Sequence, residues 1–116
     1  MPVKLKRVYD VPSPDDGHRV LVDRLWPRGL TKDRAAVDSW AKDAAPSAEL
    51  RRAFHRGDLA WEEFEAAYRL ELTGNPAVGA LRTELAAHPT STLLFSVNDL
   101  VRNHAVILLD VLGSGS

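Results

Sequence analysis

The alternation of apolar and polar positions predicts two well-defined strands. Residues 19–26 read RVLVDRLW, and an extended chain places Val20 and Val22 on one side and two leucines on the other. Residues 91–97, STLLFSV, are likewise apolar on both sides. Strands that are apolar on both faces are typical of a parallel sheet covered by helices, so both runs predict an α/β domain.

The rest of the chain predicts one weaker strand and several helices. Residues 4–10, KLKRVYD, are short and β-prone, and the loop residues that follow them end this strand. A helix is predicted after Thr31, a candidate N-cap, with an apolar stripe through Val37, Trp40 and Ala44. Further helices are predicted over residues 48–56 and 58–72, around the spaced apolar residues of 78–85, and directly after the second strong strand, with Asn98 or Asp99 as its cap.

These elements predict a single α/β domain over residues 1–112. Its sheet is expected to be small and largely parallel, with about three strands flanked by several helices. The first strong strand is predicted to end near Trp26, because Pro27 cannot donate a hydrogen bond to a sheet. The last residues, 113–116, read GSGS and are expected to form a flexible tail.

Composition and charge narrow the classes of function. The 116 residues include 15 basic and 16 acidic side chains, so attraction for a polyanion would have to be local, and nucleic-acid binding is not expected. The chain has no cysteine, which excludes disulfides, thiolate zinc sites and cysteine nucleophiles. No apolar run approaches the roughly 18 residues of a membrane span, and the N-terminus does not resemble a signal peptide. We therefore expect a cytoplasmic protein without a membrane partner.

Two segments that follow the strong strands carry the polar residues of a potential site. Residues 23–29, DRLWPRG, follow the first strand, and residues 97–105, VNDLVRNHA, follow the second. In open α/β sheets, ligands bind beyond the carboxyl ends of the strands. We therefore expect a polar crevice where these two segments meet.

The first segment offers an acid and two arginines. Planar guanidinium groups suit bidentate contact with carboxylate or phosphate, so Arg24 and Arg28 are predicted to bind an anionic small molecule. Asp23 is either a catalytic carboxylate or one half of a structural ion pair, for example with Arg28 or Arg19. Trp26 either stacks on a ligand or packs in the core.

The second segment offers an acid, an amide and a histidine. Asp99 either caps the predicted helix or acts catalytically, and Asn103 lies one turn further on as a candidate ligand-binding residue. His104 stands on an apolar stripe, four residues from Leu100 and from Leu108, where a histidine is usually buried and hydrogen-bonded. Its alternative role is proton transfer, because imidazole titrates near neutral pH.

Motifs for other chemistries are absent. The four histidines show no zinc-binding spacing, no nucleophile-elbow pattern surrounds a serine, and no glycine-rich loop of a common phosphate-binding type occurs. We therefore expect neither a metal nor a cofactor.

Residues 8–30, VYDVPSPDDGHRVLVDRLWPRGL, resemble the bacterial domain of unknown function 488, in its short YeaO-like branch. The similarity continues through DSWAKDAAPSAELRRAFH, WEEFEAAYRLEL and NDLVRNHAVILLDVL and covers residues 7–112. The resemblance implies a small cytoplasmic α/β domain. It also implies that the polar residues of the two segments form one cluster, namely Asp23, Arg24, Arg28, Asp99, Asn103 and His104.

The chain departs from that family at one position. Many relatives carry a lysine where this chain has Asn98. If that lysine is catalytic in the relatives, this chain is expected to bind a ligand without turning it over. Some relatives carry a porphyrin methyltransferase label, but nothing in this sequence resembles a methyl-donor cofactor loop, so that activity is not expected.

Three interpretations of the site are compatible with the sequence. In the first, the protein is a small enzyme acting on an anionic, phosphorylated or nucleotide-like molecule, which Arg24 and Arg28 hold while Asp23 or Asp99 moves protons with His104. In the second, the crevice binds a ligand or a protein without chemistry. In the third, which we rank behind the other two, the charges only lock a loop and the protein acts by oligomerising, for example as a homodimer.

Overall fold

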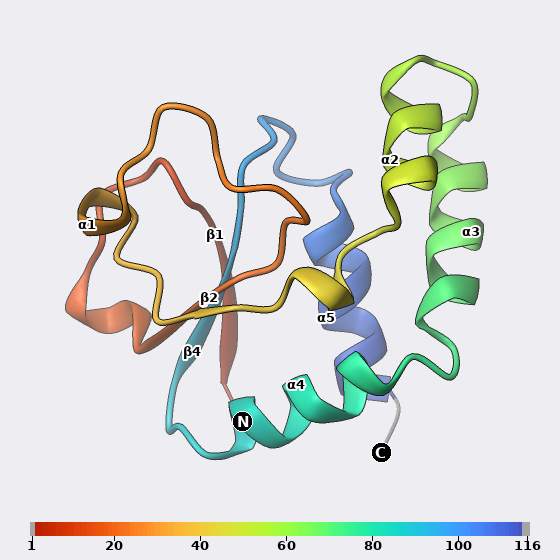
Figure 1. Ribbon diagram of the computed structural model, residues 1–116. Coiled ribbons are helices and arrows are strands. Elements are labelled where there is room, and N and C mark those ends of the chain that lie inside the picture. Colours follow the sequence, from red (N-terminus) through yellow and green to blue (C-terminus); the bar gives the residue numbers. More distant parts are fainter. Residues whose placement is uncertain (1, 115–116) are drawn as a thin grey trace.

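The computed structural model describes residues 2–114 and contains a four-stranded parallel sheet (Figure 1). In sheet order the strands are β1 (Val3–Arg7), β4 (Ser91–Phe95), β2 (His18–Leu21) and β3 (Ser39–Trp40). Every strand pair is parallel, which confirms the predicted α/β class. The predicted number of strands was too low, because β3 lies in a segment that the spacing assigned to a helix.

The two strands that the sequence predicts most clearly lie at the centre of the sheet. All five residues of β4 are buried, and Leu93 and Leu94 point to opposite faces. They pair with Val20 and Leu21 of β2, which are also fully buried. Each such side chain contributes about 2 kcal/mol by its removal from water, so the pattern that is apolar on both faces places β2 and β4 in the interior.

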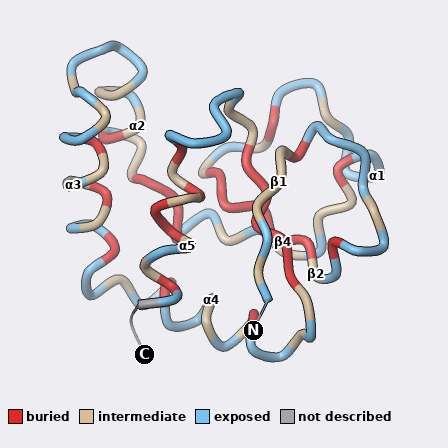
Figure 2. The backbone as a smooth tube through the Cα atoms, turned by 180° about the vertical axis from the view of Figure 1, so that it is seen from behind, coloured by how far each residue is buried: buried red, intermediate tan, exposed pale blue. Residues whose placement is uncertain are grey.

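Helices cover one face of the sheet. They are α2 (Ala48–His55), α3 (Trp61–Leu72), α4 (Pro76–Ala86) and α5 (His104–Ser114), and the first three agree well with the predicted helical segments. Figure 1 shows α5 between the sheet and α3, with α2 alongside α3. Figure 2 shows buried residues along the sheet and along α3 and α5, and the main hydrophobic core lies there.

The opposite face is covered by a long loop and one short helix, α1 (Lys32–Ala35). Leu21 and Leu94 form a second, smaller core on this side, against which Trp26 and Leu30 pack. The segment that follows β2 therefore has two tasks, because it covers this core and also leads to the candidate site.

The helix predicted from Thr31 to Ala44 is wrong beyond its first turn. Thr31 does cap α1, but Ala36 adopts a left-handed conformation with φ 50° and ends the helix. The chain then pairs with the free edge of β2 as β3, where the Ala41 N–H donates to the Leu21 carbonyl at 2.8 Å. A 3₁₀ turn, η2 (Lys42–Ala44), follows. The backbone hydrogen bonds formed at the open edge of the sheet stabilise this segment more than a short helix with the same apolar spacing would.

β2 ends earlier than predicted, at Leu21 rather than near Trp26. The Val22 N–H still donates to the Leu94 carbonyl at 3.0 Å. At the next step the N–H of Ser96 is satisfied by the side chain of Asp23 instead of a main-chain carbonyl. The ladder therefore stops where the first polar side chain replaces the backbone acceptor.

α5 begins at His104, later than predicted, and its cap is neither Asn98 nor Asp99. The Oδ1 atom of Asp99 instead closes a turn by accepting from the N–H groups of Val101 and Arg102. The α5 helix extends through Ser114 into the segment expected to be a tail, and residues 115–116 lie outside the described part of the chain. Among the helices of residues 2–114, none has the length and apolar character needed to cross a membrane.

Candidate functional site

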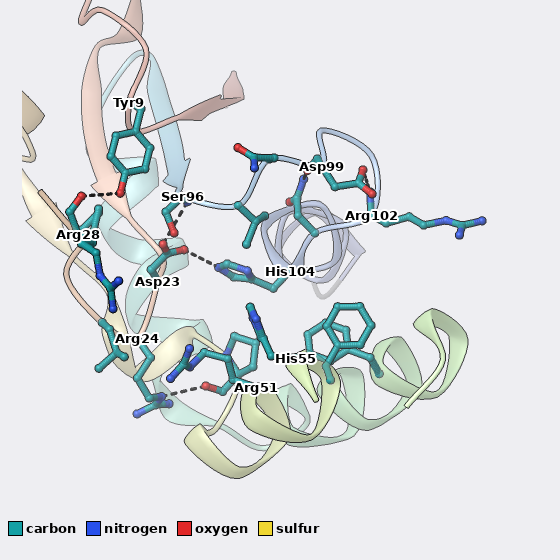
Figure 3. Close-up of a pocket in the computed structure, with 18 of the residues that line it drawn as sticks. Tyr9, Asp23, Arg24, Arg28, Arg51, His55, Ser96, Asp99, Arg102 and His104 are labelled. Carbon is teal, nitrogen blue, oxygen red and sulfur yellow. Dashed lines mark hydrogen bonds and ion pairs between the residues drawn. The ribbon is translucent and has the colours of Figure 1, made fainter. Parts of the chain in front are cut away.

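A cavity of about 610 Å³ lies at the carboxyl ends of β2 and β4 (Figure 3). Its walls come from the loop after β2, the loop after β4, and the helices α2 and α3. The seven residues that the sequence singled out all line it: Asp23, Arg24, Trp26, Arg28, Asp99, Asn103 and His104. The parallel topology thus brings the two polar segments together, as ligand-binding α/β sheets do.

Asp23 and His104 form an acid–histidine contact in the lining of the cavity. Asp23 is 8% exposed, and its Oδ2 atom accepts from the Ser96 N–H at 3.1 Å. The Nε2 atom of His104 lies 2.9 Å from the Val22 carbonyl oxygen and 3.0 Å from Oδ1 of Asp23. Both neighbours are acceptors, so Nε2 is a donor nitrogen that carries a proton.

The partners considered for Asp23 in the sequence, Arg19 and Arg28, do not contact it. Arg19 is buried and pairs with Asp16 at the other end of β2. Oδ1 of Asp23 makes no hydrogen bond of good geometry within residues 2–114, and it faces the imidazole of His104 at ion-pair distance. The histidine therefore takes the place that an arginine was expected to fill.

Two further candidate residues are held by main-chain contacts. Arg24 donates from Nε to the Pro46 carbonyl at 2.9 Å and from Nη2 to the Ala45 carbonyl at 3.1 Å, which ties the loop after β2 to the start of α2. Asn103 is buried, donates to the Asp99 carbonyl at 2.8 Å and caps α5 through its side-chain oxygen, which accepts from the Val106 N–H at 3.0 Å. Both residues shape the cavity wall whether or not they touch a ligand.

Asp99 and Trp26 are held by contacts within their own loops. Asp99 is exposed, and the N–H groups of Arg102 and Val101 lower the pKa of its carboxyl below the ordinary value. Asp99 is thus an ionised turn residue. Trp26 is half-buried, and its indole N–H donates to the Leu30 carbonyl at 2.7 Å. Trp26 therefore serves the second core and also lines the cavity.

The cavity is rich in arginines that have no acidic partner. Those that line it are Arg24, Arg28, Arg51 and Arg102. No salt bridge with an Asp or Glu side chain forms at any of these four in the part of the chain that the structure describes. Outside the cavity, Arg19, Arg56 and Arg69 are ion-paired, and four other arginines are not paired within the same residues, namely Arg7, Arg34, Arg52 and Arg82. Figure 3 shows Arg24, Arg28 and Arg51 gathered on one side of the cavity, while Arg102 points away.

Sequence reasoning missed the wall supplied by α2 and α3. Arg51, Phe54 and His55 project from one side of α2, and Trp61 and Phe64 project from α3. The spacing of Arg51, Phe54 and His55, three and four residues apart, is a signal in the sequence for a shared helix face. Nothing in the sequence, however, indicates that this face lies opposite the strand ends.

The aromatic residues of this wall form one continuous cluster. The rings of Phe54 and Phe64 stack with centroids 4.5 Å apart. The Trp61 ring lies 5.6 Å from that of Phe64 and 6.0 Å from that of Phe54. The cavity therefore combines a basic side with an aromatic side. Residues 2–114 contain no cluster of three or more histidine, aspartate or glutamate side chains arranged to hold a metal ion.

Comparison with known proteins identifies the family. The profile of the inactive DUF488-N3 subclade matches residues 2–115. The chain belongs to this family. Among curated relatives, the uncharacterised protein YeaO of Escherichia coli strain K12 is 42% identical over 114 residues, which cover 98% of this chain and 99% of YeaO. The DUF488 resemblance of the sequence, in its YeaO-like branch, is thereby confirmed.

Relatives also occur in mycobacteria. The uncharacterised protein Rv3073c of Mycobacterium tuberculosis strain H37Rv is 41% identical over 110 residues, covering 95% of this DUF488 chain and 92% of its own length. The uncharacterised protein Mb3100c of Mycobacterium bovis gives the same figures. No solved structure matches the chain significantly.

Proposed function

We propose that this DUF488 protein binds an anionic small molecule, phosphorylated or nucleotide-like, in the cavity beyond β2 and β4 and releases it unchanged. The observation that carries the proposal is that three arginines without a carboxylate partner in the described chain, Arg24, Arg28 and Arg51, gather on one side of the cavity (Figure 3). Guanidinium groups bind phosphate and carboxylate through paired hydrogen bonds, and unpaired ones gathered in a concave site favour an anion.

The electrostatics of the cavity support an anionic ligand. Two acidic side chains, Asp23 and Asp99, line the cavity together with four arginines, so positive charge is in excess, and Asp23 faces His104. The Nε atom of Arg51 is buried and has no hydrogen-bond acceptor in the described chain. An unsatisfied buried donor costs about 1–3 kcal/mol, and a bound anion would remove that cost. The N-terminal end of α5 also lies at the cavity and adds a partial positive charge.

Several features favour binding without turnover. The guanidinium of Arg24 and the Nε2 atom of His104 are both engaged by main-chain carbonyls, which holds them in place. Asn98 lines the cavity and offers an uncharged amide, whereas the family resemblance implies a lysine at this position in relatives. The description of the matching subclade as inactive agrees with this interpretation.

An enzyme is the second candidate, and one observation favours it. The Nδ1 atom of His104 has no hydrogen-bond partner within residues 2–114, while Asp23 faces Nε2 of the same ring at 3.0 Å. A carboxylate behind a histidine whose second nitrogen is unoccupied is an arrangement suited to a general base. Incubation with a bound phosphate ester followed by ³¹P NMR separates the two functions. An unchanged spectrum supports simple binding, and a new resonance that is lost in His104→Ala establishes turnover.

Calorimetric titration with inorganic phosphate and pyrophosphate tests the binding itself. Arg51→Gln is expected to weaken binding about tenfold or more, since it removes a charged donor from the site. Arg52→Gln is the matched control, because Arg52 is the next residue of α2, is exposed and does not line the cavity. Equal loss in both variants, or no binding of either ion by the wild-type protein, would show that the cavity is not an anion site.

A further inference from the structure

The cavity is much larger than the anion that its basic groups could hold. Its volume of about 610 Å³ lies within the range of about 300–1,000 Å³ in which proteins bind whole small molecules. Arg24, Arg28 and Arg51 gather on one side of it (Figure 3). The remaining wall must therefore contact a part of the ligand that carries no negative charge.

The wall that would contact the uncharged part of the ligand is aromatic and partly exposed. Phe64 is buried and belongs to the main core, whereas Phe54 and Trp61 are half-buried and line the cavity. Their rings lie 6.0 Å apart. Aromatic rings prefer to pack against other rings in stacked or edge-to-face arrangements, so a surface of this kind selects a flat ring over a flexible chain.

One basic and one aromatic side chain of the cavity are neighbours on α2. Arg51 and Phe54 are three residues apart and His55 follows, so all three project from one side of the helix. Side chains with this spacing have Cβ atoms about 5–6 Å apart. Figure 3 shows His55 directed into the cavity between the arginines and His104. A ligand that reaches both surfaces needs its ring close to its anionic group.

We propose that the ligand is a phosphate monoester with a flat aromatic ring near the phosphate. Arg24, Arg28 and Arg51 bind the phosphate, and the ring packs on Trp61 and Phe54. Trp61 is then the residue that determines specificity. This inference rests on the proposed anion-binding function and adds the chemical class of the ligand.

Calorimetry with methyl phosphate and phenyl phosphate separates the two parts of the site. The wild-type protein is expected to bind phenyl phosphate about tenfold more tightly than methyl phosphate, because the ring adds aromatic packing. Trp61→Leu should remove most of this difference, since only Phe54 then packs on the ring, and its affinity for methyl phosphate is the reference for the phosphate end of the site. Trp61→Phe should retain most of the difference, since it preserves an aromatic surface.

The outcomes distinguish this inference from the function on which it rests. Equal binding of the two esters by the wild-type protein overturns the aromatic assignment while anion binding stands. If neither ester nor phosphate binds, the proposed function fails as well. Should Trp61→Leu not fold, ¹⁵N-resolved NMR of the wild-type protein decides. The indole N–H of Trp61 must shift with phenyl phosphate and not with methyl phosphate, and an unshifted signal at saturation refutes the proposal.

Discussion

Arg24→Gln is expected to destabilise the fold, because Arg24 connects two segments that no regular element joins. Its guanidinium donates at 2.9 Å and 3.1 Å to the carbonyl groups of Pro46 and Ala45, and both of these residues are buried. A hydrogen bond with a charged donor contributes about 1.5–3 kcal/mol, and a glutamine is too short to restore both bonds. Arg24 is half-buried and partly screened by solvent, so we expect a total loss of about 2–4 kcal/mol.

Urea denaturation followed by circular dichroism measures this loss. The midpoint should fall with an unchanged slope, and the melting temperature should fall by about 10 °C for a domain of this size. Arg28→Gln is the matched control from the same loop. The Arg28 side chain is exposed and makes no hydrogen bond within the described residues, so its replacement should change the free energy of unfolding by about 0.5 kcal/mol or less. If the two variants are equally stable, the structural role assigned to Arg24 is wrong.

Three other predictions concern parts of the fold that support the site. Asp16 is buried; burial raises the pKa of its carboxyl, but hydrogen bonds from a loop N–H and two basic side chains lower it more, so the pKa lies below its ordinary value. The ionised carboxylate therefore stabilises the fold at neutral pH, and this stabilisation is lost as the pH falls below about 4. Urea midpoints measured between pH 7 and 3 should fall less steeply in Asp16→Asn than in the wild-type protein. Burial raises the pKa of Tyr68 far above its ordinary value, and its hydroxyl donates to the Ala44 carbonyl at 2.6 Å. Tyr68→Phe should cost about 1–2 kcal/mol in thermal denaturation, and a neutral result would contradict this bond. Gly17 has φ +65° and its added Cβ would collide with the Thr90 carbonyl, so Gly17→Ala should lower the melting temperature by several degrees, in contrast to Gly79→Ala, where the space is open.

The elements that the sequence predicts correctly are those whose signal is local. β2 and β4 are apolar on both faces, and only a position inside a covered sheet buries both. α2 and α3 have strong helical spacing between clear boundaries, so their segments could be assigned from the sequence.

The elements that the sequence predicts wrongly are those for which two local structures, such as a helix and a strand, compete for the same residues. Residues 37–44 have helical spacing, yet Ser39 and Trp40 join β2, because an unpaired sheet edge offers backbone hydrogen bonds that a short, weak helix does not match. The sequence offered Asn98 or Asp99 as the cap of the last helix and assigned Asn103 to ligand binding. The structure selects Asn103, and Asp99 closes the turn before it.

For the candidate site, the sequence by itself determined two of the three walls. Parallel strands end at the same edge of a sheet. Once both strands are assigned to one sheet, the polar residues after β2 and β4 must therefore lie close together. Only the tertiary structure decided that Asp23 faces His104, and that α2 and α3 bring Arg51 and Trp61 to the same cavity. Those contacts join residues far apart along the chain, and they depend on how the helices pack on the sheet. Helix packing is set by the combined shape of many side chains, which no short stretch of sequence encodes.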